Sequence, residues 1–215
     1  MLVGDSYAAA MAPAVAAAMP DARFVRLMRS SCPAIEIAVN STNGPYPACD
    51  EYHQLVNALV AEIRPDVLVM ENWWGQLLQD RLVSGATDEA ALTEWADALG
   101  ATIQRWSPSV GAVRVIASTP GGADLTDCAT PVSVPADCIS QVRNVYTEVI
   151  DAEAASVASL SNPAVTYIRT RDWVCSTTGS CPSFINNTPV YIDSGHLTDK
   201  QAESLAPLLA PELVG

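Results

Sequence analysis

The chain has 215 residues, of which 49% are hydrophobic and 16% charged, and 24 acidic against 11 basic residues give it a formal net charge of −13. This length fits one globular domain over residues 1–215, and the hydrophobic fraction is too high for a disordered chain. No apolar run reaches the roughly 20 residues that a membrane span needs. The negative charge and the scattered arginines argue against nucleic acid as a partner, because phosphates would be repelled.

Five short apolar segments, rich in β-branched residues, have the composition of strands. They are residues 1–3, 22–27, 66–70, 113–117 and 165–168. Strands alternate with segments of helical spacing, which predicts a doubly wound α/β domain, a parallel sheet with helices on both faces. In such a fold the ligand site lies at the carboxyl ends of the strands, where the strand order reverses.

The first helix is expected to open at Pro13, because proline suits the first position of a helix, and residues 6–12 are then expected to form a turn. The later helical patterns place apolar residues three or four apart. These patterns cover residues 50–64, 92–106, 137–160 and the segment from 199 onward.

Two of these helices carry further detail. In the helix over residues 50–64, Leu55, Leu59 and Ile63 are spaced four apart and are expected to share the buried face. The spacing of Thr198 to Gln201 fits a capping box at the start of the last helix.

The six cysteines fall into three pairs, each within one stretch rich in Pro, Gly, Ser and Thr. The pairs are Cys32 and Cys49, Cys128 and Cys138, and Cys175 and Cys181. There is no Cys-x-x-Cys motif and neither histidine lies beside a pair, so we expect no metal site. Disulfides are favoured, and the short loops favour pairing in sequence order among the possible connectivities. The alternative is a cytosolic protein with six buried thiols.

Disulfides imply an oxidising compartment, yet the N-terminus offers no signal peptide. Met1-Leu2-Val3 leads directly into Gly4-Asp5-Ser6, and the sequence begins inside a predicted strand. We therefore expect a domain excised from a longer, membrane-anchored protein. Its preceding residues would supply export and anchoring, which would place the domain outside the cytoplasm.

Ser6 follows the first predicted strand and precedes the first helix. Its hydroxyl is expected at the carboxyl end of the strand, with its own N–H at a helix N-terminus, where developing negative charge is favoured. That position suits a nucleophile. The alternative is that Asp5 or Ser6 serves only as an N-cap.

Asp193 and His196 lie three residues apart just before the last helix. On a helical turn this spacing lets the carboxylate reach one imidazole nitrogen while the other points outward, as in a general base held by an acid. Alternatively, Asp193 is a turn residue and His196 a surface side chain. A nucleophile after the first strand and a base before the last helix can meet only at the rim of a parallel sheet.

Gly4-Asp5-Ser6 after the first strand and Asp193-x-x-His196 before the last helix resemble the first and last blocks of the SGNH (GDSL-like) hydrolases. The resemblance spans residues 4 to 198. It implies a three-layer, flavodoxin-like fold of the SGNH hydrolase type with a five-stranded parallel sheet. It also implies that Ser6 is the nucleophile, His196 the general base and Asp193 the residue that orients it, in acyl transfer through a serine ester.

The resemblance also implies an oxyanion hole, which the family builds from the N–H of the nucleophile, a Gly after the second strand and an Asn after the third. Asn72 is the natural candidate for that Asn, although its surrounding Glu71-Asn72-Trp73-Trp74 departs from the family pattern. No glycine follows the second strand before Gly44. Either a backbone N–H around Ser30 or Ser31 is expected to substitute, or the hole is expected to form only when an acyl group binds. Trp73 and Trp74 are expected either to line the acyl pocket or stack on a sugar ring, or to divide between core and surface.

These departures, with Gly-Asp-Ser-Tyr-Ala in the first block and Ser31-Cys32-Pro33 after the second strand, resemble one subgroup. It comprises the extracytoplasmic SGNH domains fused behind bacterial membrane acyltransferases, which acylate envelope glycans and lipids. The resemblance implies an acyl donor, acetyl transfer to a sugar or lipid acceptor, and an upstream membrane acyltransferase domain as partner. No residue pattern calls for a cofactor.

Two other functions are compatible with the same residues. An esterase or deacetylase would share the acyl-serine but resolve it with water instead of an acceptor hydroxyl. A glycan-binding module that has lost turnover would explain the irregular oxyanion segment, although Ser6, Asp193 and His196 are all present.

Overall fold

The computed structural model describes residues 1–75 and 80–214. Its centre is a sheet of five parallel strands in the order β2-β1-β5-β6-β8. The strands are β1 Leu2–Gly4, β2 Arg26–Met28, β5 Val67–Glu71, β6 Ala112–Ile116 and β8 Val165–Ile168. The chain crosses from β2 back over β1 to β5, so the strand order reverses around β1.

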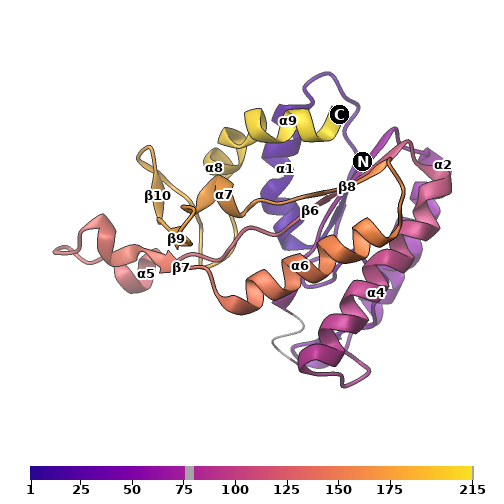
Figure 1. Ribbon diagram of the computed structural model, residues 1–215, viewed down its shortest axis with the longest axis horizontal. Coiled ribbons are helices and arrows are strands. Elements are labelled where there is room, and N and C mark those ends of the chain that lie inside the picture. Colours follow the sequence, from indigo (N-terminus) through magenta and orange to yellow (C-terminus); the bar gives the residue numbers. More distant parts are fainter. Residues whose placement is uncertain (76–79, 215) are drawn as a thin grey trace.

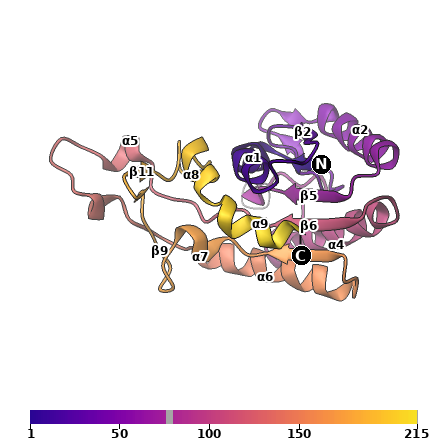
Figure 2. The ribbon, with the colours of Figure 1, turned by 90° about the horizontal axis from the view of Figure 1, so that it is seen from above.

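Helices cover both faces of the sheet (Figures 1 and 2). One face carries α1 Ser6–Ala18, α8 Asp199–Ser204 and α9 Ala206–Val214, and the other carries α2 Pro47–Ile63, α4 Asp88–Trp106 and α6 Asn144–Ser159. Successive strand residues enter opposite cores: Leu2 packs with the first set of helices and Val3 with the second. The predicted three-layer, doubly wound α/β fold is confirmed.

Shorter elements connect these layers. They are β3 Asn40–Ser41, β4 Gly44–Pro45, the 3₁₀ turn η1 Ser107–Ser109, α5 Leu125–Cys128, the 3₁₀ turn η2 Pro135–Cys138, β7 Ser140–Gln141, α7 Arg171–Val174, β9 Ser180–Cys181, β10 Phe184–Ile185 and β11 Thr188–Pro189. The segment around α5 extends well away from the sheet in both views (Figures 1 and 2). We call residues 124–139 the arm.

The three disulfides pair in sequence order, as expected. Cys32–Cys49 joins the segment after β2 to the first turn of α2, and both residues are buried. Cys128–Cys138 closes the arm, and Cys175–Cys181 links the end of α7 to β9. No described helix combines the length and the hydropathy that crossing a bilayer requires.

The first helix begins at Ser6 and not at Pro13, which lies inside α1. A proline inside a helix removes one hydrogen bond and costs about 3 kcal/mol. Asp5 offsets part of that cost, because its side chain accepts the N–H of Tyr7 and so caps the helix. The surrounding alanines, which have the highest helix propensity, favour the helix further.

The buried face of α2 is also offset from the prediction. Leu55 and Ile63 are exposed, whereas Tyr52, Val56 and Val60 are buried. The disulfide at the first turn of α2 fixes the rotation of the helix, and the Tyr52 hydroxyl donates toward the carbonyls of Gly4 and Leu27. These tertiary contacts decide which of two apolar stripes faces the sheet.

The observed starts of one helix and one strand also differ from the predicted ones. The helix expected over residues 137–160 starts only at Asn144, because Cys138 is held in the arm by its disulfide and Ser140 pairs with Cys181 in β9. The second strand begins at Arg26 and not at residue 22, since the turn after α1 runs to residue 22 and residues 23–25 belong to no assigned element.

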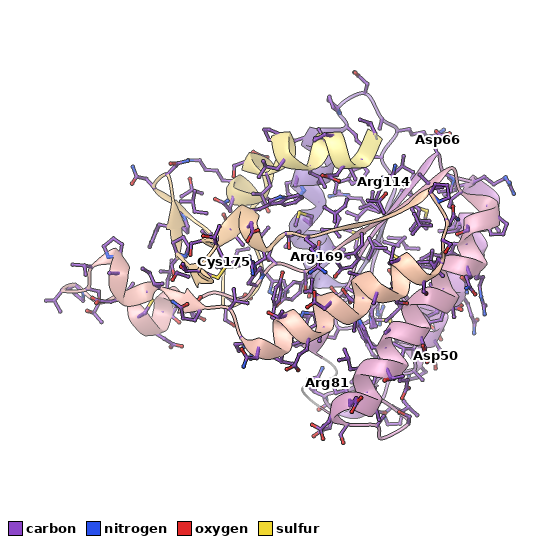
Figure 3. The ribbon with its side chains drawn as sticks, viewed as in Figure 1. Asp50, Asp66, Arg81, Arg114, Arg169 and Cys175 are labelled. Atoms are coloured by element: carbon purple, nitrogen blue, oxygen red, sulfur yellow. A yellow bond between two sulfur atoms is a disulfide. The ribbon has the colours of Figure 1, made fainter. Side chains whose placement is uncertain are left out.

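One arginine secures the end of the chain to the sheet. Arg114 projects from β6 toward α9 (Figure 3), where its Nε donates to the carbonyl of Glu212 at 2.8 Å. Its Nη1 donates to the carbonyls of Val113 and Ala164. A buried cation is thus satisfied by carbonyl oxygens, which fixes α9 against β6.

Candidate active site

The turn between β1 and α1 places Ser6 at the carboxyl edge of the sheet. Gly4 has φ +151°, and a Cβ added there would lie 2.0 Å from the carbonyl oxygen of Glu71 and 2.5 Å from Cβ of Ala8. Only glycine therefore fits where β1, β5 and α1 meet. Asp5 is the N-cap of α1 and Ser6 its first residue, so the Ser6 N–H belongs to the positive end of the helix.

His196 lies between Ser6 and Asp193. Its Nε2 is 2.8 Å from Oγ of Ser6, and its Nδ1 is 2.7 Å from Oδ2 of Asp193. The three side chains form one continuous hydrogen-bonded chain. The sequence expectation that they meet at the rim of the sheet is correct, but the segment around Asp193 is a series of bends rather than a helical turn.

The second oxygen of Asp193 holds this loop together. Its Oδ1 accepts the backbone N–H groups of Gly195 at 2.7 Å and of His196 at 2.8 Å. Partial burial acts to raise the pKa of Asp193, but these N–H groups and the imidazole more than offset it, so the pKa lies below its ordinary value. An ionised Asp193 accepts from Nδ1–H, which leaves Nε2 of His196 as an acceptor for the Ser6 hydroxyl.

Asp5, which directly precedes Ser6, is a buried carboxylate. Its Oδ1 accepts the N–H of Tyr7 at 2.9 Å, and its Oδ2 accepts the N–H of Trp73 at 2.7 Å. Burial raises its pKa to about 6, against the opposing effect of those hydrogen bonds. Sequence reasoning considered Asp5 only as an N-cap. Its link to the segment after β5 is tertiary and leaves no local signal.

The two oxyanion candidates lie after the strands on either side of β1. Asn72 follows β5, is buried, and accepts the N–H of Ala34 on Oδ1 at 2.6 Å. Across residues 1–75 and 80–214, no hydrogen bond uses its Nδ2, so the amide donor is available. Ser31 lies in the turn after β2 and has φ +55°. The two residues thus follow the two strands that flank β1, the strand that leads to Ser6.

The two tryptophans divide between surface and core. Trp73 is half-buried and stacks on Tyr7, with ring centroids 5.8 Å apart and planes 9° apart. Tyr7 lies 4.7 Å from the His196 ring, so these aromatic rings form a wall beside the hydrogen-bonded chain. Trp74 is 4% exposed and packs edge-on against Tyr146.

Gly195, in the loop before His196, lies in close contact with Tyr7 of the aromatic wall. A Cβ on Gly195 would lie 2.0 Å from the Tyr7 hydroxyl.

One cluster of potential metal ligands occurs within the described residues, at Cys32, Cys49 and His53. Both sulfurs are joined in a disulfide and cannot act as thiolate ligands.

Comparisons with known proteins agree with the fold. Residues 1–211 match the family described as SGNH domain (fused to AT3 domains). The fold is similar to the structure of the periplasmic domain of a lipopolysaccharide acetyltransferase from Salmonella ser. Paratyphi A. That match has a TM-score of 0.72 at 17% identity and covers 99% of this chain and 82% of the other. A search of curated proteins gave no match. The chain belongs to the SGNH domains that are fused to AT3 membrane acyltransferase domains.

Proposed function

We propose that this chain transfers an O-acyl group, specifically acetyl, to a hydroxyl of a cell-envelope glycan or lipid through an ester on Ser6. The observation that carries the proposal is the hydrogen-bonded chain Ser6–His196–Asp193 at the rim of the sheet. It is the arrangement of a nucleophile, a general base and an orienting carboxylate.

In this proposal Oγ of Ser6 attacks the carbonyl carbon of the acyl donor while Nε2 of His196 takes the hydroxyl proton. Asp193 stabilises the imidazolium that forms. The oxyanion of the tetrahedral intermediate is held by the Ser6 N–H and Nδ2 of Asn72. Collapse of the intermediate expels the donor alcohol, which takes the proton from His196, and leaves an acyl ester on Ser6.

The second half reverses these steps with an acceptor. His196 removes the proton from an acceptor hydroxyl, whose oxygen attacks the acyl-serine carbonyl, and the proton then returns to Oγ of Ser6 as the new ester departs. Water in place of the acceptor would make the same site an esterase. The aromatic wall of Tyr7 and Trp73 would cover the apolar part of the acyl group.

Two further findings support a place outside the cytoplasm. The three disulfides suit an oxidising compartment, and the similar Salmonella fold is a periplasmic domain. Membership in a family fused to AT3 domains supports a membrane acyltransferase as the source of the acyl group. We propose that such a domain precedes this one in the native protein and anchors it.

The test compares the chain with its Ser6→Ala variant on 4-nitrophenyl acetate, with and without a sugar acceptor. Loss of a triad member can cost on the order of 10⁴-fold in kcat, so the variant should be nearly inactive. Ser159→Ala, at an exposed site at the end of α6, serves as the matched control. Acetylated sugar in the product would distinguish transfer from hydrolysis. Equal rates for the chain and Ser6→Ala would contradict the proposal.

A further inference from the structure

Asp5 is a buried ionisable residue next to the nucleophile, and the reaction proposed for Ser6 does not use it. The residue is 0% exposed. Capping a helix does not require such burial, since Asp124 caps α5 through the N–H two residues further on and stays partly exposed. Because removing a carboxyl group from water costs free energy, the burial of Asp5 indicates contacts beyond the cap.

The two oxygens of Asp5 bind two different segments. Oδ1 accepts the N–H of Tyr7, in the first turn of α1, at 2.9 Å, and Oδ2 accepts the N–H of Trp73, after β5, at 2.7 Å. Burial raises the pKa of Asp5 to about 6, so at pH 8 both oxygens are acceptors. Trp73 directly follows Asn72. One side chain thus connects the nucleophile turn to the segment that carries the proposed oxyanion donor.

This contact lies where the strand pairing between β1 and β5 ends. Gly4 and Glu71 are the last paired residues of the two strands. Asp5 and Asn72 are the next residues of the two segments. Past the last pair the backbone ladder no longer joins them, and the hydrogen bond from the Trp73 N–H to Oδ2 of Asp5 continues the connection.

The side-chain amide of Asn72 is held by a separate contact. Its Oδ1 accepts the N–H of Ala34 at 2.6 Å, and Asn72 is 5% exposed. An N–H donor must face the amide oxygen, so this bond sets the rotation of the amide and with it the direction of Nδ2. It does not fix the backbone of Asn72, whose peptide bond to Trp73 carries the N–H that Asp5 accepts. Both contacts are needed to place Nδ2.

We propose that Asp5 is a positioning residue for the oxyanion hole: by accepting the N–H of Trp73, it holds the amide of Asn72 at the correct distance from Oγ of Ser6. This inference rests on the proposed function, which assigns Nδ2 of Asn72 to the oxyanion. Placement matters because an oxyanion donor works only when it is preorganised, and a displacement of about 1 Å can cost on the order of 10²-fold in rate.

Asp5→Asn separates the two hydrogen bonds. Asn is as good an N-cap as Asp, so its oxygen keeps the N–H of Tyr7, while its amide group faces the N–H of Trp73 and cannot accept it. Asp5→Ser is the second variant, because Ser also caps helices and has a single side-chain oxygen. Asp124→Asn is the matched control, since the hydrogen bonds described for the Asp124 side chain both come from Thr126, in its own turn.

The first measurement follows the position of Asn72 without turnover. Protein labelled with ¹⁵N is studied by NMR at pH 8, and the signals are the backbone N–H of Trp73 and the side-chain NH₂ of Asn72. Both should shift in Asp5→Asn and Asp5→Ser and stay unchanged in Asp124→Asn. A thermal melt of each variant confirms that it is folded. Unchanged Asn72 signals in a folded Asp5 variant would overturn the proposal, whether or not the protein is active.

The second measurement is a double-mutant cycle on the turnover of 4-nitrophenyl acetate at pH 8. Asn72→Ala should lower kcat about 10²–10³-fold, as expected for the loss of one oxyanion donor. Asp5→Asn should lower kcat by about tenfold to 10²-fold, because Tyr7 still stacks on Trp73 and retains part of the placement. The loss should fall on kcat and not on KM, since the oxyanion forms only in the transition state.

The double variant separates positioning from a general structural role. If Asp5 acts through Asn72, Asp5→Asn adds no further loss to Asn72→Ala. Losses that multiply, or an unchanged kcat in Asp5→Asn alone, would overturn the positioning role and leave the proposed function intact. A parent chain without turnover would contradict the proposed function, and the NMR signals of Asn72 would then decide whether Asp5 holds this residue in place.

Discussion

The two carboxylate oxygens of Asp193 have different partners. One oxygen orients the His196 ring, and the other holds the backbone of the loop. Oδ1 accepts two backbone N–H groups and shapes the loop, while Oδ2 faces Nδ1 of His196. The short spacing of Asp193 to His196 made their contact predictable from sequence. The contact of Asp5 with Trp73 was not predictable, because it joins residues 68 positions apart through a buried carboxylate.

We predict that Asp193→Asn abolishes activity without unfolding the protein. The Asn oxygen can still accept both backbone N–H groups, but its amide would donate to Nδ1 of His196 and leave the proton on Nε2, facing Ser6. The general base would then be lost, at a cost on the order of 10⁴-fold in kcat. Steady-state kinetics and a thermal melt measure the two effects. A variant within tenfold of the parent rate would show that the Oδ2 contact does not matter.

At the scale of elements, the alternation of strands and helices was enough to predict the layers of the fold. Local sequence patterns gave the wrong buried face or boundary of a helix where contacts with distant segments determine it. Periodicity predicted a buried stripe of Leu55, Leu59 and Ile63 on α2, whereas the disulfide from Cys32 turns the stripe that contains Tyr52 toward the sheet. Periodicity also extended the helix now assigned to α6 back to residue 137, where the disulfide of Cys138 and the pairing of Ser140 with Cys181 prevent it.

The meeting of β1, β5 and α1 is the element contact on which the position of Ser6 depends. Gly4→Ala would combine a strained φ with overlap against the backbone of β5, which cannot move aside. Gly44→Ala is a matched control, since Gly44 also has positive φ, +108°, but an added Cβ would meet nothing within 4 Å. Strain alone costs about 1–3 kcal/mol. Urea unfolding should show Gly4→Ala destabilised by at least about 3 kcal/mol and clearly more than Gly44→Ala. Equal losses of unfolding free energy in the two variants would contradict the close contact between Gly4 and the backbone of β5.

At the scale of the whole molecule, this acidic chain buries three carboxyl groups among residues 1–75 and 80–214. Asp5, Glu71 and Glu153 are all buried, and burial raises the pKa of each. Glu153 accepts hydrogen bonds from Nε1 of Trp95 and the hydroxyl of Tyr167, which partly offset its burial. Composition could not predict these three buried carboxyl groups, because it gives the number of acidic residues and not which of them are buried in the folded protein.

The pKa of Glu153 predicts how stability changes with pH. Its value in the folded protein is about 7 against 4.5 for an ordinary glutamate, so the folded state keeps a proton that the unfolded state releases between these values. The free energy of unfolding should therefore fall as pH rises from about 4.5 to 7. Glu153→Gln removes this contribution, and its stability relative to the parent should rise by about 3 kcal/mol across that window. Urea unfolding at both pH values tests this, and a constant difference would contradict it.

The central claim is that the acyl group passes through Ser6. The most direct measurement is an acid quench of the chain during turnover of 4-nitrophenyl acetate, followed by mass spectrometry of its peptides. The account predicts acetyl on the peptide that contains Ser6, and none on that peptide in Ser6→Ala. Continued turnover in Ser6→Ala, with acetyl on another residue or on none in the parent, would contradict it.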